Sequence, residues 1–302
     1  MDVKLKIKTM VETTQDLPAM PQVWLKIREL TQQPDVAVRT IANEILKDQS
    51  MTTRLLKAAN SSKYVSYRKH ITTVTDAVMV LGFSEVRNVV IGYAFYKMMD
   101  QLNKNKQFDF KAFWMHSLTT GAAARMIAEN VQYVSTEEAF VAGLLHDIGK
   151  LVIGQLMLQE YEAVQALMNN GMQDIEAEQE IFHVDHQEIG RWVAERWYFP
   201  ELLVHVISQH HRTELEDREK SLFRLVDIIS VANDMAHLIV LENKQELMKR
   251  IYACHHKSFY LFGLSKDRCL DIVRELPALM RKEMADFGSA NIQMSELESL
   301  VI

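Results

Sequence analysis

The sequence has few of the residues that interrupt or cross-link a fold. Its 302 residues include only 10 Gly and 5 Pro. Long helices joined by short connections use few of either, so this scarcity favours an all-α fold. The two cysteines, Cys254 and Cys269, are too few for a disulfide framework and form no Cys-x-x-Cys pair. A reducing, cytoplasmic location is therefore expected.

Long apolar runs and excess positive charge are also missing. No uninterrupted apolar stretch approaches the roughly 20 residues that a membrane span needs, and the N-terminus alternates charged and apolar residues, unlike a signal peptide. We therefore expect no membrane partner. The formal net charge of -6 argues against a broad cationic surface. A helix pair at residues 40–60 permits a helix-turn-helix interpretation, but its second helix offers only Arg54 and Lys57 as cations, so nucleic-acid binding is disfavoured.

Helical periodicity organises the whole chain, which is long enough for one large or two modest domains. The polar, lysine-rich segment 101–106 is the best linker candidate. We therefore expect an N-terminal helical part over residues 1–105 and a helical bundle over 106–241. Residues 242–302 are expected to form a C-terminal helical extension.

The most informative stretch is Gly143-Leu-Leu-His-Asp-Ile-Gly-Lys150. Periodicity predicts that it belongs to one helix over residues 135–153, which begins at a capping box of Ser135 and Glu138. On that helix Gly143, His146, Asp147 and Lys150 share a polar stripe beside an apolar arc. Such a stripe can hold a divalent cation, and Gly143 leaves room for a neighbouring helix or a ligand. By spacing alone, a solvated helix face is the favoured alternative.

Four further histidines lie on other predicted helices. His116 lies among small residues, where a lone histidine is more often a hydrogen-bonded core residue than a ligand. His186 begins another helix, and His210 and His211 end the next one, where they can complement the helix dipole. Each of these histidines is a weak signal when taken alone.

Together these stretches resemble a known family. Gly143-Leu-Leu-His-Asp-Ile-Gly-Lys-Leu resembles the signature of the HD superfamily, helical metal-dependent phosphohydrolases and their relatives. Further landmarks resemble those of the HDOD family of HD-related bacterial signalling proteins: Leu17-Pro-Ala-Met-Pro, Leu55-Leu-Lys-Ala-Ala-Asn-Ser, Ile71-Thr-Thr-Val and Val86-Arg-Asn-Val-Val. The resemblance covers about residues 15 to 240. It implies a multi-helix, phosphodiesterase-like HD bundle with an N-terminal helical subdomain.

The resemblance also implies a ligand set, because HD-type phosphodiesterases hold one or two metals with His and Asp from several helices. Lys150 is implied as a catalytic cation for a phosphate or leaving group. Nitrogen and oxygen donors suit a divalent ion such as Fe, Mn, Ni, Zn or Mg. The implied metal ligands are His116, His146, Asp147, His186, His210, His211 and Asn233.

Two departures from the active families count against catalysis. Their metal-binding Asp lies in an Ala-Asp pair on the late helix, where this chain has Asn233, although a shifted register would bring in Asp234 or Asp227. An amide oxygen is neutral and a poorer ligand for a hard cation than a carboxylate. The Gly-Tyr-Pro segment of the cyclic-dinucleotide subfamily is also replaced, here by Arg212-Thr-Glu-Leu.

We therefore expect a non-catalytic regulatory HDOD protein that acts through protein partners and keeps a relic metal site. The alternative is a metal-dependent phosphohydrolase acting on a nucleotide or cyclic dinucleotide. A nucleotide sensed in the relic pocket also stays open, and direct nucleic-acid binding is the least favoured function.

Overall fold

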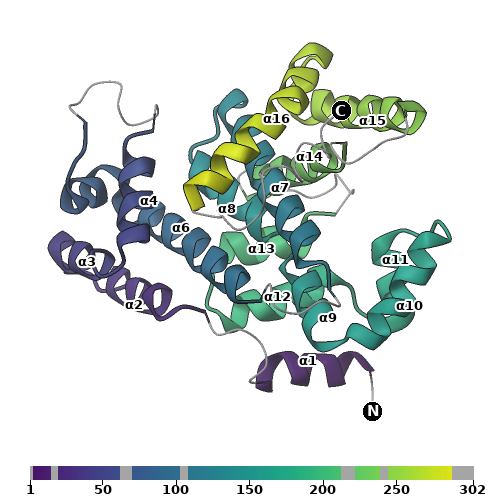
Figure 1. Cartoon of the computed structure of the whole chain (residues 1–302), viewed down its shortest axis with the longest axis horizontal. Helices are drawn as coiled ribbons and strands as arrows, with labels where there is room; N and C mark the ends of the chain where they lie inside the picture. Colours follow the sequence, from purple (N-terminus) through teal and green to yellow (C-terminus); the bar gives the residue numbers. More distant parts are fainter. Residues whose placement is uncertain are drawn as a thin grey trace.

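The computed structural model describes residues 3–14, 20–61, 70–102, 108–211, 222–238 and 244–287. Every regular element within these residues is an α-helix, which confirms the all-α prediction. The first helix, α1 (Val3–Thr13), lies at the bottom of Figure 1. The other N-terminal helices lie to the left and are α2 (Gln22–Thr31), α3 (Val38–Ile45), α4 (Gln49–Ala59) and α6 (Val74–Leu102), the last of which runs from there toward the centre.

The long helix α6 joins the N-terminal helices to the centre of the molecule. It packs against α2, α3 and α4 and then runs onto α8 (Figure 1). Its backbone breaks at Gly82, where φ is 76° and ψ is 163°. Glycine adopts a positive φ at little cost, so the chain bends there without strain.

The central bundle follows in the sequence and holds the largest share of the buried side chains. Its helices are α7 (Phe110–Asn130), α8 (Thr136–Leu145), α9 (Ile148–Leu156), α12 (His186–Arg196), α13 (Glu201–Gln209) and α14 (Leu222–Leu238). A Cβ on Gly143 would lie 2.8 Å from the Gly121 Cα, so α7 and α8 meet at these two glycines. Gly143 therefore makes room for a neighbouring helix, as its lack of a side chain predicts.

The predicted single helix over residues 135–153 is wrong in one respect. Ser135 caps α8 as expected, since its hydroxyl accepts a hydrogen bond from the Glu138 amide at 3.0 Å. However, α8 ends at Leu145, and α9 begins at Ile148. Asp147 holds the N-cap position of α9, but its side chain makes no capping hydrogen bond to that helix. The carboxylate is therefore left for other partners.

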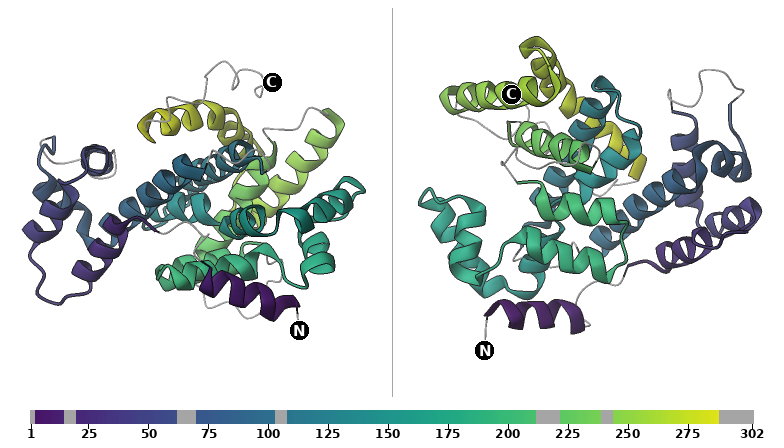
Figure 2. Two further views of the ribbon diagram at one scale, coloured as in Figure 1. Left: turned by 60° about the horizontal axis from the view of Figure 1, so that its bottom comes forward. Right: turned by 180° about the vertical axis from the view of Figure 1, so that it is seen from behind.

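The remaining helices surround this bundle (Figure 2). Helix α1 lies along α12, where Arg196 of α12 donates to the Val11 and Thr14 carbonyls and Lys4 pairs with Glu188 at 2.7 Å. The other peripheral helices are α10 (Leu158–Asn169), α11 (Asp174–Phe182), α15 (Lys244–Phe262) and α16 (Lys266–Phe287).

Two segments, Val74–Met99 and Thr136–Leu156, pass a length and hydropathy test for membrane spans, with 67% and 83% of their most apolar windows buried inside the molecule. Core packing accounts for their apolar character. Most of the predicted linker at 101–106 lies outside the described residues, as does Arg212-Thr-Glu-Leu.

Candidate metal centre

Side chains from four parts of the bundle converge on the Asp147 carboxylate. His116 comes from the middle of α7, and His146 comes from the break between α8 and α9. His186 stands at the first position of α12, and His210 follows the last residue of α13. Asp147, His146, His186 and His210 are all at most 1% exposed.

The two oxygens of Asp147 face different histidines. Oδ2 lies 3.3 Å from His146 Nε2 and 3.5 Å from His116 Nε2. Oδ1 lies 3.3 Å from both His186 Nε2 and His210 Nε2. Potential ligand atoms therefore form two groups that share the carboxylate. One group is His116, His146 and Asp147, and the other is Asp147, His186, His210 and His211.

The ring nitrogens face the carboxylate as acceptors. His146 Nδ1 is 2.7 Å from the Gly143 carbonyl oxygen, and His210 Nδ1 is 3.0 Å from that of Ile207. A carbonyl only accepts, so each Nδ1 carries the proton, and in the neutral ring Nε2 has a lone pair. Each lone pair then faces an Asp147 oxygen at 3.3 Å. Electron-rich atoms this close are stable only with a positive charge between them, either a proton or a metal ion.

The donor set fits a metal. Two nitrogens each about 2.1 Å from one ion, at an angle near 100°, are about 3.2 Å apart. The His116 and His146 Nε2 atoms are 3.3 Å apart, and those of His186 and His210 are 3.4 Å apart. Asp147 Oδ1 and His211 Nε2 are buried without a hydrogen-bond partner. Ligation would satisfy both atoms.

Outer partners orient these ligands. Glu178 of α11, 1% exposed, accepts hydrogen bonds of 2.7 Å from both the Nδ1 and the backbone amide of His186. Lys150 Nζ lies between two carboxylates, 3.0 Å from Asp147 Oδ2 and 2.9 Å from Asp174 Oδ2. Glu178 and Asp174 could not be identified from the sequence, because nothing in the local pattern of α11 distinguishes them from solvated acids.

The acids and Lys150 are charged in this environment. Burial alone raises the pKa of Asp147, but when a proton provides the positive charge between His146 and Asp147, His146 and Lys150 together outweigh burial and hold that pKa well below its usual range. Burial likewise opposes ionisation of Asp174, and Lys150 outweighs it and lowers the pKa. Burial lowers the pKa of Lys150, and the two carboxylates more than compensate and raise it.

Most of the histidines are held neutral, the form that binds metals. Burial lowers the pKa of His116 and of His211, and it lowers that of His210 to about 4. His186 differs, because the Glu178 carboxylate outweighs the effect of burial and raises its pKa. A neutral His186 that donates to Glu178 through Nδ1 still presents its Nε2 lone pair to the centre.

A model of the HDOD domain matches residues 17–213. The chain belongs to the HDOD family. It is 24% identical over 225 residues to an uncharacterized protein of Treponema pallidum (strain Nichols), an alignment that covers 72% of this chain and 42% of that protein. The chain thus matches less than half the length of this relative.

Two solved structures share the HDOD fold with this chain. An HDOD domain protein of unknown function from Geobacter sulfurreducens has a TM-score of 0.64 at 24% identity, with 92% of this chain and 98% of that one covered. A candidate phosphohydrolase from Shewanella amazonensis SB2B has a TM-score of 0.63 at 24% identity, with 95% of each chain covered. At this identity the likeness shows the fold alone.

Helix α14 lies beyond the residues that match the HDOD model, and it also reaches the centre. The His237 ring is 4.6 Å from that of His116, between centroids. Burial, followed by the neighbouring His116, lowers the pKa of His237 to about 3. Asn233 lies one helical turn earlier, 4% exposed, and its Oδ1 has no hydrogen-bond partner. His237 was not among the ligands implied by the sequence.

The shifted register that would place Asp234 in the centre is wrong. Asp234 pairs with Lys257 of α15 at 2.8 Å, and its side chain is 42% exposed. Adjacent residues on a helix point about 100° apart, so the buried face of α14 presents Asn233 and turns Asp234 toward α15.

Proposed function

We propose that this HDOD protein holds a divalent metal at Asp147 and uses it for regulation rather than hydrolysis. The observation that carries the proposal is the set of Nε2 lone pairs facing the two oxygens of one buried carboxylate. The ligands would be His116 and His146 on one side of Asp147, and His186, His210 and His211 on the other. When bound, a divalent ion supplies Lewis acidity to the site.

The regulatory role follows from where the ligands originate. They come from α7, the α8–α9 break, the start of α12 and the end of α13. An ion held by all of them fixes the relative positions of these helices, so metal occupancy changes the stability and shape of the bundle. Protein partners that contact the outer faces of these helices would detect this change.

Two features of this chain support the absence of catalysis. Asn233 offers a neutral amide where the active HD families are expected to have a carboxylate, and this weakens the hold on a second ion. Lys150 is bound to Asp147 and Asp174, so its charge already balances protein carboxylates rather than meeting a phosphate.

Metal analysis combined with a hydrolysis assay tests this proposal. Purified protein, loaded with Mn²⁺ and dialysed, should retain metal. His146→Ala should lose at least tenfold in affinity, because it removes a direct ligand. The control His256→Ala changes an exposed histidine on α15 and should bind normally. Loading with Mn²⁺ should also raise the midpoint of thermal unfolding of the native chain and of His256→Ala, but not that of His146→Ala. Native protein that retains no metal would refute the proposal.

The second candidate is a phosphohydrolase. The feature that favours it is the pair of ligand groups on either side of Asp147, an arrangement suited to two ions bridged by one carboxylate. We expect bis(p-nitrophenyl) phosphate and cyclic di-GMP to be hydrolysed at background rates by the Mn²⁺-loaded chain. Hydrolysis that His146→Ala abolishes and His256→Ala preserves would establish this second function and overturn the first.

A further inference from the structure

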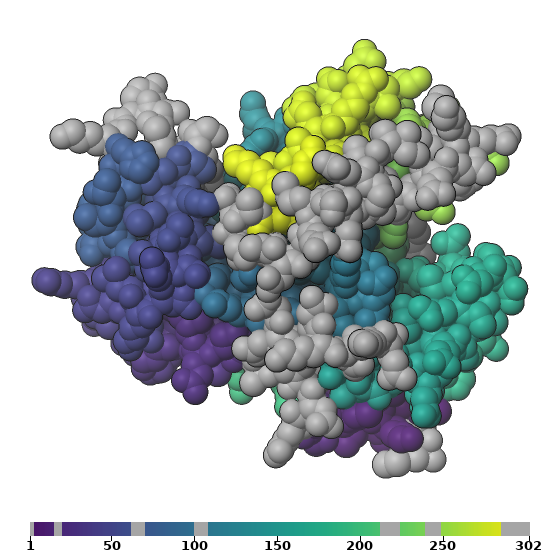
Figure 3. Space-filling view, viewed as in Figure 1, coloured from purple at the N-terminus to yellow at the C-terminus, as the bar shows by residue number. Residues whose placement is uncertain are grey.

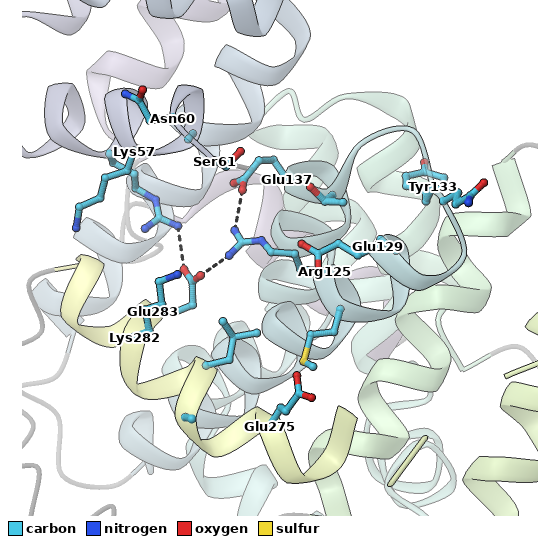
Figure 4. Close-up of a pocket in the computed structure, with 18 of the residues that line it drawn as sticks. Lys57, Asn60, Ser61, Arg125, Glu129, Tyr133, Glu137, Glu275, Lys282 and Glu283 are labelled. Atoms are coloured by element: carbon cyan, nitrogen blue, oxygen red, sulfur yellow. Dashed lines mark hydrogen bonds and ion pairs between the residues drawn. The ribbon is translucent and has the colours of Figure 1, made fainter. Parts of the chain in front are cut away.

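A second buried cluster of charges joins four helices. Glu283 of α16, 5% exposed, pairs with Arg54 of α4 at 3.7 Å and also with Arg125 of α7. Arg125 pairs in addition with Glu137 of α8 at 2.9 Å. In Figure 4 the Glu283 side chain reaches from α16 toward Arg125, with α4 above it. One carboxylate therefore receives two guanidinium groups that lie 71 positions apart in the sequence.

These charges line a cavity with a volume of about 1240 Å³. Sites for drug-sized ligands are typically about 300–1,000 Å³, so this cavity has room for a nucleotide-sized molecule. On the face seen in Figure 3, the surface of α16 extends toward the N-terminal helices. The charged lining residues are Arg54, Lys57, Arg125, Arg268 and Lys282, with Glu129, Glu137, Glu275 and Glu283.

Arg125 is set as an anion receptor. Its guanidinium stacks on the Phe140 ring, 4.1 Å from the centroid, and this contact fixes the orientation of the guanidinium plane. Its Nε is buried and has no hydrogen-bond partner. The Arg54 guanidinium lies 5.7 Å from the same ring centroid. Two arginines that converge on one oxyanion form the arrangement with which proteins bind carboxylates and phosphates.

We propose that this cavity is a second ligand site, which takes a phosphorylated small molecule of nucleotide size, and that Glu283 occupies its anion position in the free protein. A phosphate group that replaces Glu283 meets Arg54 and Arg125, and the exposed Lys57 and Lys282 lie on the same cavity wall. Without Glu283, the cavity presents five cationic side chains against three acidic ones.

Binding at this site has a structural consequence. Glu283 forms ion pairs from α16 to both α4 and α7, so its displacement removes these links and loosens the C-terminal helix from the N-terminal part of the molecule. Helix α16 also packs along α7, where Thr119 donates a hydrogen bond to the Met280 sulfur at 3.0 Å. Because α7 carries His116, the two sites share a helix, but the second site does not depend on the metal.

Isothermal titration calorimetry tests the proposal. The full chain is titrated with inorganic pyrophosphate, ATP and adenosine in the presence of EDTA, so that no ion at the Asp147 centre binds phosphate. Pyrophosphate and ATP should bind, and adenosine should not. Glu283→Gln should tighten ATP binding at least tenfold, because it removes the internal competitor and one negative charge. Arg54→Gln should weaken it at least tenfold.

The control variant is Arg274→Gln. Arg274→Gln removes a cation from α16 outside the cavity, where the side chain is 74% exposed, and should leave ATP binding unchanged. If Arg54→Gln fails to fold, the exposed-residue variants Lys57→Gln and Lys282→Gln should each still weaken ATP binding about threefold. A purely structural ion network predicts that Glu283→Gln gains no affinity. That result, or the absence of phosphate binding in both the native and Glu283→Gln chains, would overturn the proposal.

Discussion

Replacing Asn233 with aspartate tests the electrostatics of the metal centre directly. The centre holds three carboxylates, Asp147, Asp174 and Glu178, against the ammonium of Lys150. Two divalent ions bring four positive charges to these two net negative charges. Asn233→Asp adds a third net negative charge on the buried face of α14. The affinity for a second ion should therefore increase more than the affinity for the first.

The size of the gain can be estimated. A carboxylate about 5 Å from a dication attracts it by about 6.6 kcal/mol at an effective dielectric constant of about 20. Dehydration of the buried carboxylate offsets most of this attraction. A remainder of about 1.4 to 2.7 kcal/mol corresponds to a tenfold to hundredfold gain in affinity. In the metal-free chain only the cost remains, and we expect Asn233→Asp to lower the free energy of unfolding by about 2 kcal/mol.

Two measurements on chelator-stripped protein check this estimate. Calorimetric titration with Mn²⁺ gives the affinity, and urea unfolding followed by tryptophan fluorescence gives the stability with and without the ion. Asn169→Asp is the matched control, since it adds the same charge at an exposed position on α10 and should change neither quantity. Equal Mn²⁺ affinity in the native and Asn233→Asp chains would show that Asn233 is not at the centre. Hydrolysis need not appear in the variant.

Three further predictions concern the supports of the fold and the site. A Cβ on Gly149 would lie 1.9 Å from the His186 carbonyl oxygen, so Gly149→Ala should lower the free energy of unfolding in urea by about 3 kcal/mol or more. The control Gly92→Ala meets only flexible side-chain ends, Val141 at 3.2 Å and Leu144 at 3.9 Å, and should change that free energy by about 1 kcal/mol or less. Glu178→Gln removes the negative acceptor of His186 and should weaken Mn²⁺ binding about 10- to 100-fold in the same titration, whereas Glu180→Gln on the exposed side of α11 should not. Burial alone raises the pKa of Asp48, but hydrogen bonds from the Met51 amide and Tyr93 hydroxyl outweigh it and lower the pKa. The ionised carboxylate therefore stabilises the fold above the ordinary pKa of 3.8, and this contribution disappears as the pH falls through the lowered value. Because solvent screens this partly exposed carboxylate, Asp48→Asn should cost only about 0.5 to 1 kcal/mol at pH 7 in urea unfolding. The cost should decrease progressively as the pH falls below 3.8, and a cost independent of pH would show that the charge of Asp48 does not stabilise the fold.

The order of chemical signals along the chain was sufficient to predict the class of fold and the family. Few glycines and prolines, together with continuous helical periodicity, indicate an all-α molecule whatever its tertiary arrangement. The His-Asp pair and the landmarks before residue 100 are short sequence motifs, and they identify the HDOD family without coordinates. The ligand candidates His116, His146, His186 and His210 were named for the same reason.

Tertiary structure decided how these residues are used. Periodicity carried the helix through residues 146 and 147, but packing breaks it there and turns Asp147 away from the α9 amides toward four imidazoles. Helix packing also determines that Glu178 pairs with His186 and Asp174 with Lys150, although the chain has many similar acids. Glu283 meets Arg54 from a position 229 residues away. Local sequence patterns report only which face of a helix is apolar, whereas the partner of a buried charge depends on which helices pack together, and this is settled only when the chain is folded.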